Sequence, residues 1–142
     1  GMLQACAELG VTFVAYSPLG RAFLTGTIGK VEELPESDFR RISPRFQGAA
    51  LDRNNQLVPA LGKFAAEHRA KPAQIALAWL LGKHKHVVPI PGTKRSARVD
   101  ENVAATGVAL SADEAAKLSA ALPPGAAAGG RYPDGGMKAV YI

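Results

Sequence analysis

The stretch VVPIPGTKRSARVDEN, Val87 to Asn102, decides the fold of this 142-residue chain. Its first residues, Val87 to Ile90, form a short apolar run, which predicts a buried strand. Pro91 ends the strand, Gly92 allows the backbone to approach a ligand closely, and Ser96 is a suitable N-cap for the helix that follows. We therefore predict a strand, a tight turn and a helix whose first amide groups are available to an anion.

The turn after this strand is rich in groups that bind anions. Thr93 offers a hydroxyl, and the next two residues are both basic. On the helix, Arg98, Glu101 and Asn102 follow the i, i+3, i+4 spacing, so they share one face. A guanidinium can clamp a phosphate, and a carboxylate with an amide can bind the edge of an adenine or a ribose. The pattern favours a phosphate-binding corner; a solvated basic turn beside an exposed helical ion pair is the alternative.

A second strand and turn lie earlier in the chain. The run VTFVAY, Val11 to Tyr16, is rich in β-branched and aromatic residues, which predicts a buried strand that Pro18 and Gly20 end. Tyr16 can hold a flat ring, and the turn at Ser17 can hold a phosphate. A rigid connection between a strand and a helix is the alternative for this turn.

Helices flank and separate the two predicted strands. The apolar spacing and capping residues predict helices over 2–9, 57–68, 73–81, 98–105 and from Ser111 to about Leu122. Pro72 stands where a first helical residue is expected, and Gly82 is expected to end that helix. Ser111 and Glu114 form a capping-box pattern. Strands separated by helices imply parallel pairing with right-handed crossovers. Val99 and Val103 are expected to point toward the core.

Two strands make an incomplete parallel sheet, since such sheets are covered on both faces and contain more strands. The sequence therefore predicts part of a larger α/β fold. We expect the chain to associate with itself through exposed strand edges. The apolar residues that would normally meet further strands are Val11, Phe13, Val14, Val87 and Val88.

Composition limits the classes of protein and partner. The formal net charge is +5, which favours anionic partners, while aromatic residues make up only 6%. The single cysteine, Cys6, excludes a disulfide within the chain, so a reducing cytoplasm is the expected setting. The most apolar run, Ile75 to Gly82, is too short to span a bilayer, so no membrane partner is expected.

Several of these stretches together resemble aldo-keto reductases that carry a YSPLGRG and a PGTK pattern. The matching segments, in order and over nearly the whole chain, are VTFVAYSPLGRAFLTG, DFRRISPRF, KPAQIALAWLLG, VVPIPGTKRSARVDEN and GGRYPDGGM. The resemblance implies an α/β fold, a (β/α)₈ TIM barrel with NADP(H) at its C-terminal face. Residues 1–142 would be one partial barrel domain: the last two β/α units, a mobile loop at 30–55 that closes over the cofactor, and a C-terminal tail at 125–142.

The same resemblance assigns cofactor contacts to both turns. Tyr16 would stack on the nicotinamide. The residues that would line the pyrophosphate follow it directly: Ser17, Leu19, Gly20 and Arg21. The residues that would surround the adenosine 2′-phosphate come from the second turn and helix: Gly92, Thr93, Lys94, Ser96 and Arg98. Glu101 and Asn102 would meet the adenine.

Three positions depart from the family pattern. Many relatives have Lys at Gly92, so the charge here must come from Lys94 or Arg95. The usual Gly after Arg21 is Ala22, and the usual Thr before Pro72 is Lys71, a poorer N-cap. None of these changes excludes cofactor binding.

Length separates this chain from a complete enzyme, since a full barrel takes about 250 residues. The family's catalytic Asp, Tyr, Lys and His belong to the first half of the barrel, so we assign no catalytic residue and no metal ligand. The resemblance implies a fragment of an NADPH-dependent reductase of aldehydes and ketones that is inactive alone.

The alternative function is a basic module that binds phosphate-bearing ligands or nucleic acid without catalysis. The net charge and the arginines Arg40, Arg41 and Arg45 motivate it. The low aromatic content and the lack of a stacking motif argue against a nucleic-acid partner.

Overall fold

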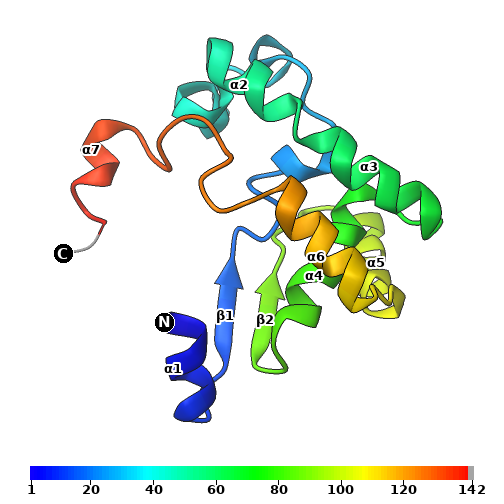
Figure 1. Cartoon of the computed structure of the whole chain (residues 1–142). Helices are drawn as coiled ribbons and strands as arrows, with labels where there is room; N and C mark the ends of the chain where they lie inside the picture. Colours follow the sequence, from blue (N-terminus) through cyan, green and yellow to red (C-terminus); the bar gives the residue numbers. More distant parts are fainter. Residues whose placement is uncertain (141–142) are drawn as a thin grey trace.

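Two short parallel strands form the only sheet in the described part of the chain, residues 1–140 of a computed structural model. Strands β1 (Phe13–Tyr16) and β2 (Val87–Ile90) pair in register, with Phe13 opposite Val87 and Tyr16 opposite Ile90. Figure 1 shows both strands side by side and pointing the same way. The predicted parallel pairing is confirmed.

The crossover between the strands carries three helices, α2 (Gly48–Asn55), α3 (Val58–Glu67) and α4 (Pro72–Lys83). Pro72 begins α4 as predicted, and the helix continues one residue beyond Gly82, where we expected it to end. The nearly all-apolar sequence of α4 is explained by its central position, since it packs against α3, β2 and α5.

Before β1 lies α1 (Met2–Glu8), and after β2 lie α5 (Ser96–Ala104) and α6 (Ala112–Ala121). The predicted capping box at the start of α6 is confirmed, because Ser111 Oγ accepts from the amide of Glu114 and the Glu114 carboxylate accepts from the amide of Ser111. The main core joins α3, α4 and α6. Its buried residues are Leu61, Ala65, Ile75, Ala76 and Leu118.

The segment 30–55, which the resemblance identifies as the loop that closes over the cofactor, contains regular elements. It contains three short 3₁₀ turns and then α2, and it forms a small second core around Ile28, Phe46 and Leu51. Helix α2 was not predicted because Leu51 is its only large apolar residue, so no helical periodicity marks it.

The C-terminal tail passes over the carboxyl ends of the strands and includes α7 (Asp134–Met137), as Figure 1 shows. The last two residues of the tail, 141–142, lie outside the described residues. Within residues 1–140, no helix has the length and apolar character needed to cross a membrane.

Two expectations about apolar side chains were wrong. Val99 and Val103 do not reach the core and are 49% and 62% exposed. They lie on the side of α5 that faces Leu81 and Val88, where the four side chains line an open apolar groove. No described element covers that groove.

The strand residues expected to meet further strands fall into an exposed group and a buried or partly buried group. Val11, Val14 and Val88 are about half exposed, as expected for open edges and an uncovered face. Val87 is buried and Phe13 is partly buried, so these two do not contribute to the exposed surface in the way we expected. Val11 lies before β1 rather than in it, because its amide bonds back to the carbonyl of Cys6 at 2.8 Å.

Candidate functional site

A groove lies at the carboxyl ends of β1 and β2, where the turns after the two strands meet. It consists of two adjoining pockets of about 670 Å³ and 380 Å³. The residues that line both pockets are Leu19, Ala22, Arg40 and Gly92. The two pockets therefore adjoin between the first turn and helix α5.

Nearly all the site residues predicted from sequence line this groove. Those at the end nearest β1 are Tyr16, Ser17, Leu19, Arg21 and Gly92. Those at the end nearest α5 include Thr93, Lys94, Arg98, Glu101 and Asn102. Gly20 lines a smaller pocket that adjoins the groove beside Tyr16 and Arg21.

Ser96 lines neither the groove nor the pocket that adjoins it. It is the first residue of α5 rather than its N-cap, which is Arg95. The hydroxyl of Thr93 accepts from the amide of Arg95 at 3.2 Å and shapes the turn before the helix. The predicted N-cap was thus wrong by one residue.

At the end nearest β1, Tyr16 presents a half-exposed ring. Its hydroxyl lies 3.3 Å from the hydroxyl of Tyr132 in the tail. That hydrogen bond and partial burial raise the pKa of Tyr16 above its ordinary value. The same bond lowers the pKa of Tyr132, and the positive charges of Arg21 and Arg131 lower it further.

Arg21 joins this end of the groove to the segment 30–55 and to the tail. Its guanidinium lies 5.4 Å from the centre of the Phe39 ring and 5.0 Å from that of Tyr132. It also donates to Ser43 Oγ at 3.2 Å and to the carbonyl of Arg131 at 2.9 Å. Arg21 therefore positions the walls of the groove.

The backbone of this turn is strained. Ser17, Arg21 and Ala22 have φ values of 49°, 61° and 71°, the left-handed region that L-residues adopt at a cost. Strain of this kind gathers at functional sites when the surrounding structure fixes it. Ala22, which stands where the family usually has glycine, thus occupies a position that glycine would fill without strain.

At the end nearest α5, Glu101 holds the basic side chains in place. Its carboxylate is only 7% exposed and pairs with Arg98 Nη1 at 2.7 Å and Lys71 Nζ at 2.5 Å. Burial raises the pKa of Glu101, but the two hydrogen bonds outweigh burial and leave the pKa below its usual value. Lys71, a departure from the family pattern, thus anchors α5 to the start of α4.

Sequence reasoning missed the residues that the segment 30–55 contributes. Arg40 lines both pockets, and Asp38 orients it through a hydrogen bond of 2.6 Å from Arg40 Nη2. This bidentate pair holds the pKa of Asp38 at about 2. The arginine cluster was the available signal, but no local pattern indicates which of its arginines reaches the groove.

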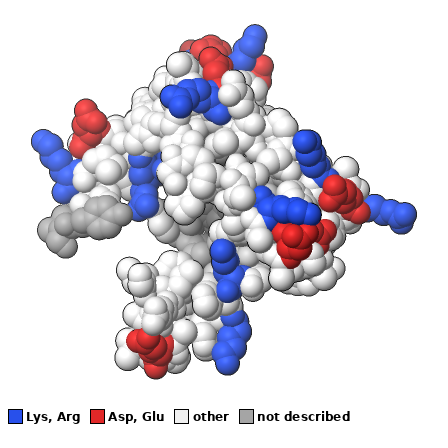
Figure 2. Space-filling model, in the orientation of Figure 1, with Lys and Arg blue, Asp and Glu red and all other residues white. Residues whose placement is uncertain are grey.

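The three arginines of that cluster have separate surroundings. Arg41 donates to the carbonyls of Glu32 and Leu34, and Arg45 lines a different pocket from Arg40. On the face drawn in Figure 2, basic and acidic side chains alternate around the molecule instead of forming one basic stripe. The cluster is therefore not a single surface patch.

The donor set of the groove suits an elongated ligand with phosphates and flat rings. One end holds basic side chains (Lys94, Arg95 and Arg98) beside the start of α5, a favourable place for an anion. The opposite end holds the exposed ring of Tyr16. A Cβ added at Gly92 would meet nothing within 4 Å, so the backbone there is open to a ligand.

Comparison with known proteins matches the chain to one family. The aldo/keto reductase family matches residues 1–123. The chain is 39% identical to aldo-keto reductase yakc [NADP(+)] of Schizosaccharomyces pombe, over all of this chain and 42% of that protein. It is 44% identical to probable aldo-keto reductase 1 of Glycine max, over 94% of this chain and 38% of that protein. The chain thus spans about two-fifths of the length of these relatives.

Solved structures agree on the fold. The thermostable aldo-keto reductase Tm1743, solved with the inhibitor epalrestat, matches with a TM-score of 0.59 and 33% identity, over 85% of this chain and 33% of that one. The glycerol dehydrogenase AKR11B4 of Gluconobacter oxydans matches with a TM-score of 0.73 and 21% identity, over 82% of this chain and 36% of that one. The predicted fold, part of a (β/α)₈ barrel, is confirmed.

Proposed function

The chain belongs to the aldo/keto reductase family, and on that premise we propose that it forms the cofactor-binding end of an NADPH-dependent carbonyl reductase. NADP(H) would lie along the groove at the carboxyl ends of β1 and β2. The observation that carries this proposal is that the two pockets of the groove adjoin and share Leu19, Ala22, Arg40 and Gly92 in their walls. An extended dinucleotide would reach from one pocket to the other across these shared residues.

The basic end would hold the adenosine 2′-phosphate. Lys94 is exposed and can turn toward a ligand, while Arg98 is fixed by Glu101. A fixed guanidinium loses little side-chain entropy when it binds a phosphate. Asn102 lines the same pocket, where its amide would face the adenine.

The other end would hold the nicotinamide against Tyr16, with the pyrophosphate near Ser17 and Leu19. When bound, the reduced nicotinamide supplies a hydride to a carbonyl carbon. The chain's own residues would orient the rings and exclude water from them. Phe39 and Arg40, from the segment 30–55, line the groove and support the proposal that this segment closes over the cofactor.

We further propose that this chain alone does not reduce aldehydes or ketones. The resemblance assigns the catalytic Asp, Tyr, Lys and His to a part of the family sequence that this chain does not span, and the chain covers only 42% of the yakc relative. NADPH-dependent turnover of a carbonyl compound by the pure chain would contradict this part of the proposal. A cytoplasmic setting is proposed from the single cysteine.

The 2′-phosphate corner can be tested with the adenosine half of the cofactor. Adenosine 2′,5′-bisphosphate should bind at least about tenfold more tightly than 5′-AMP, because charge-assisted hydrogen bonds contribute about 1.5–3 kcal/mol each. Lys94→Gln and Arg98→Gln should each remove most of that preference. Lys85→Gln, in the exposed turn before β2, is the matched control. Equal affinity for both nucleotides would contradict the assignment.

A further inference from the structure

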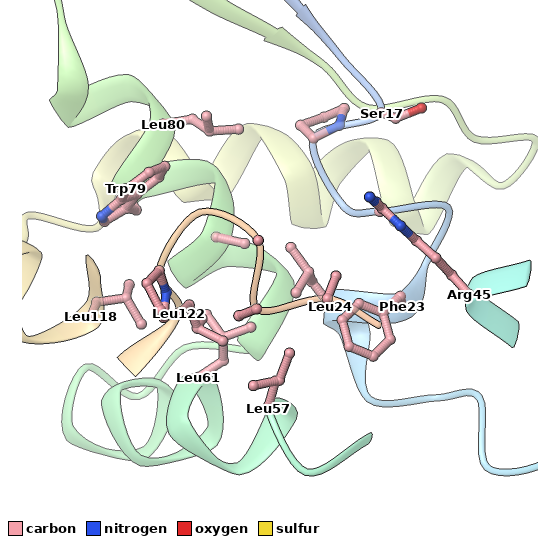
Figure 3. A pocket seen from close by; sticks show the side chains of 17 residues that line it. Ser17, Phe23, Leu24, Arg45, Leu57, Leu61, Trp79, Leu80, Leu118 and Leu122 are labelled. Carbon is pink, nitrogen blue, oxygen red and sulfur yellow. The ribbon is translucent and has the colours of Figure 1, made fainter. Parts of the chain in front are cut away.

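A separate pocket lies on the other side of the Ser17 turn from the groove, between α3, α4, α6 and residues 122–127. Its volume is about 360 Å³, within the range of pockets that hold small ligands. Most of its wall is apolar, and Leu61, Trp79 and Leu118 come from the three helices. Figure 3 shows these side chains converging on the cavity from different elements.

The pocket has one charged end. In Figure 3 the guanidinium of Arg45 lies at the opposite side from Trp79 and points toward Ser17. Among residues 1–140, Arg45 is the only charged residue that lines the pocket. The cavity therefore has an apolar body and a single cationic end.

No carboxylate within the described 140 residues forms an ion pair with Arg45. Its side chain makes one long hydrogen bond, from Nε to the carbonyl of Gly129 at 3.4 Å. A partly buried guanidinium with so few partners is favourably placed to receive an anion. Its backbone is fixed, because its carbonyl accepts from the buried Asn54 at 2.9 Å.

The walls of the pocket are held in place by hydrogen bonds between distant segments. Asn54 also binds both backbone groups of Ala128, which fixes the end of the 122–127 wall. Trp79 Nε1 donates to Ser119 Oγ at 2.9 Å, which joins α4 to α6. A cavity whose walls are already fixed loses little entropy when it binds a ligand.

We propose that this pocket is a second ligand site and that it takes a small amphipathic carboxylate. The apolar body lies against Trp79, Leu61 and Leu118, and the carboxylate pairs with Arg45. Charge complementarity at one end and apolar walls at the other select this class over neutral or cationic amphiphiles. Ser17 lines both this pocket and the groove, so a ligand here contacts the turn that also bounds the groove.

Trp79 is the only tryptophan of the chain, so its fluorescence reports on this pocket directly. The experiment titrates the full 142-residue chain with decanoate below its micelle concentration, with decanol and decylamine as probes of equal length. Decanoate should change Trp79 emission in a saturable way. Its affinity should exceed those of decanol and decylamine by about tenfold, the effect of one charge-assisted hydrogen bond.

Variants then locate the site. Arg45→Gln should reduce the affinity for decanoate to that for decanol, whereas Arg45→Lys should keep most of the preference. Ala126→Leu, which fills the cavity from the 122–127 wall, should weaken both ligands. Arg53→Gln, an exposed arginine of α2, is the matched control and should change neither affinity.

Equal binding of decanoate and decanol to the unmodified chain would overturn the proposal, because it would show apolar adsorption without charge recognition. An absence of any saturable change in Trp79 emission would overturn it as well. Both readouts use the unmodified chain, so they decide the question even if a variant fails to fold. Neither requires NADPH, so they are independent of the proposed function.

Discussion

Asn54 binds both the amide and the carbonyl of Ala128, although 74 residues separate them in the chain. The two distances are 2.7 Å to the amide and 3.0 Å to the carbonyl, and the Asn54 side chain is buried. The same amide group donates to the carbonyl of Arg45. One buried side chain therefore joins α2, the turn at Arg45 and the C-terminal tail.

We predict that Asn54→Ala lowers the free energy of unfolding by about 2–3 kcal/mol, because it leaves buried backbone groups without partners. Urea denaturation followed by circular dichroism measures this loss. Asn55→Ala is the neighbouring control, since Asn55 makes a single bond of 3.3 Å to the carbonyl of Gly29. Asn55→Ala should lower the free energy of unfolding by less than about 1 kcal/mol. Equal effects at the two positions would contradict the role of Asn54.

Ala22 has a φ of 71°. Ala22→Gly should raise the free energy of unfolding by about 0.5–1 kcal/mol, because the relief of left-handed strain exceeds the extra chain entropy that glycine loses on folding. Ala127→Gly is the control in a loop where φ is not positive, and it should lower the stability. If both glycine variants were destabilised alike, Ala22 would not be strained.

Stability should depend on pH through Asp38, whose pKa its hydrogen bonds with Arg40 hold at about 2. Because the folded pKa lies below the ordinary value of 3.8, the unfolded chain takes up the proton first as pH falls. The stabilisation from the pair is thus present above about pH 4 and is lost between about pH 4 and pH 2.

Urea denaturation across this range should therefore show that the difference between the natural chain and Asp38→Asn shrinks as pH falls from about 4 to about 2. Asp52→Asn, which also removes one exposed carboxylate, controls for the change in net charge. A difference that stays constant down to about pH 2 would show that the ion pair contributes nothing in solution.

The uncovered apolar surface predicts self-association. Val14 is exposed on β1. Four more exposed apolar side chains line one groove: Leu81, Val88, Val99 and Val103. Light scattering of the pure chain should give a mass above that of a monomer. Val103→Glu should shift the mass toward the monomer, whereas Asp100→Glu on the same helix should not. A monodisperse monomer at high concentration would contradict this prediction.

The sequence determined those parts of the fold whose signals are local. Three local signals each predicted an observed feature: the apolar run of β2, the capping box at Ser111 and Glu114, and the proline that begins α4. The family resemblance assigned the residues of both turns to one cofactor, and parallel strands bring their carboxyl ends together. The turn residues then meet in the groove as a consequence of that topology.

The rest depends on contacts between distant segments, which no local pattern reveals. Helix α2 has little periodicity and is stabilised by the buried Asn54 and Leu51. Val99 and Val103 were expected to point toward the core, yet no described element covers their side of α5. Arg40 could not be assigned to the groove because its place depends on the path of the segment 30–55.

The measurement that tests the central claim most directly is calorimetric titration of the 142-residue chain with NADPH and with NADH. The two cofactors differ only in the 2′-phosphate, which the account assigns to the corner formed by Thr93, Lys94 and Arg98. We predict that NADPH binds at least about tenfold more tightly than NADH. Equal affinities, or no binding of either cofactor, would contradict the claim that this groove is an NADPH site.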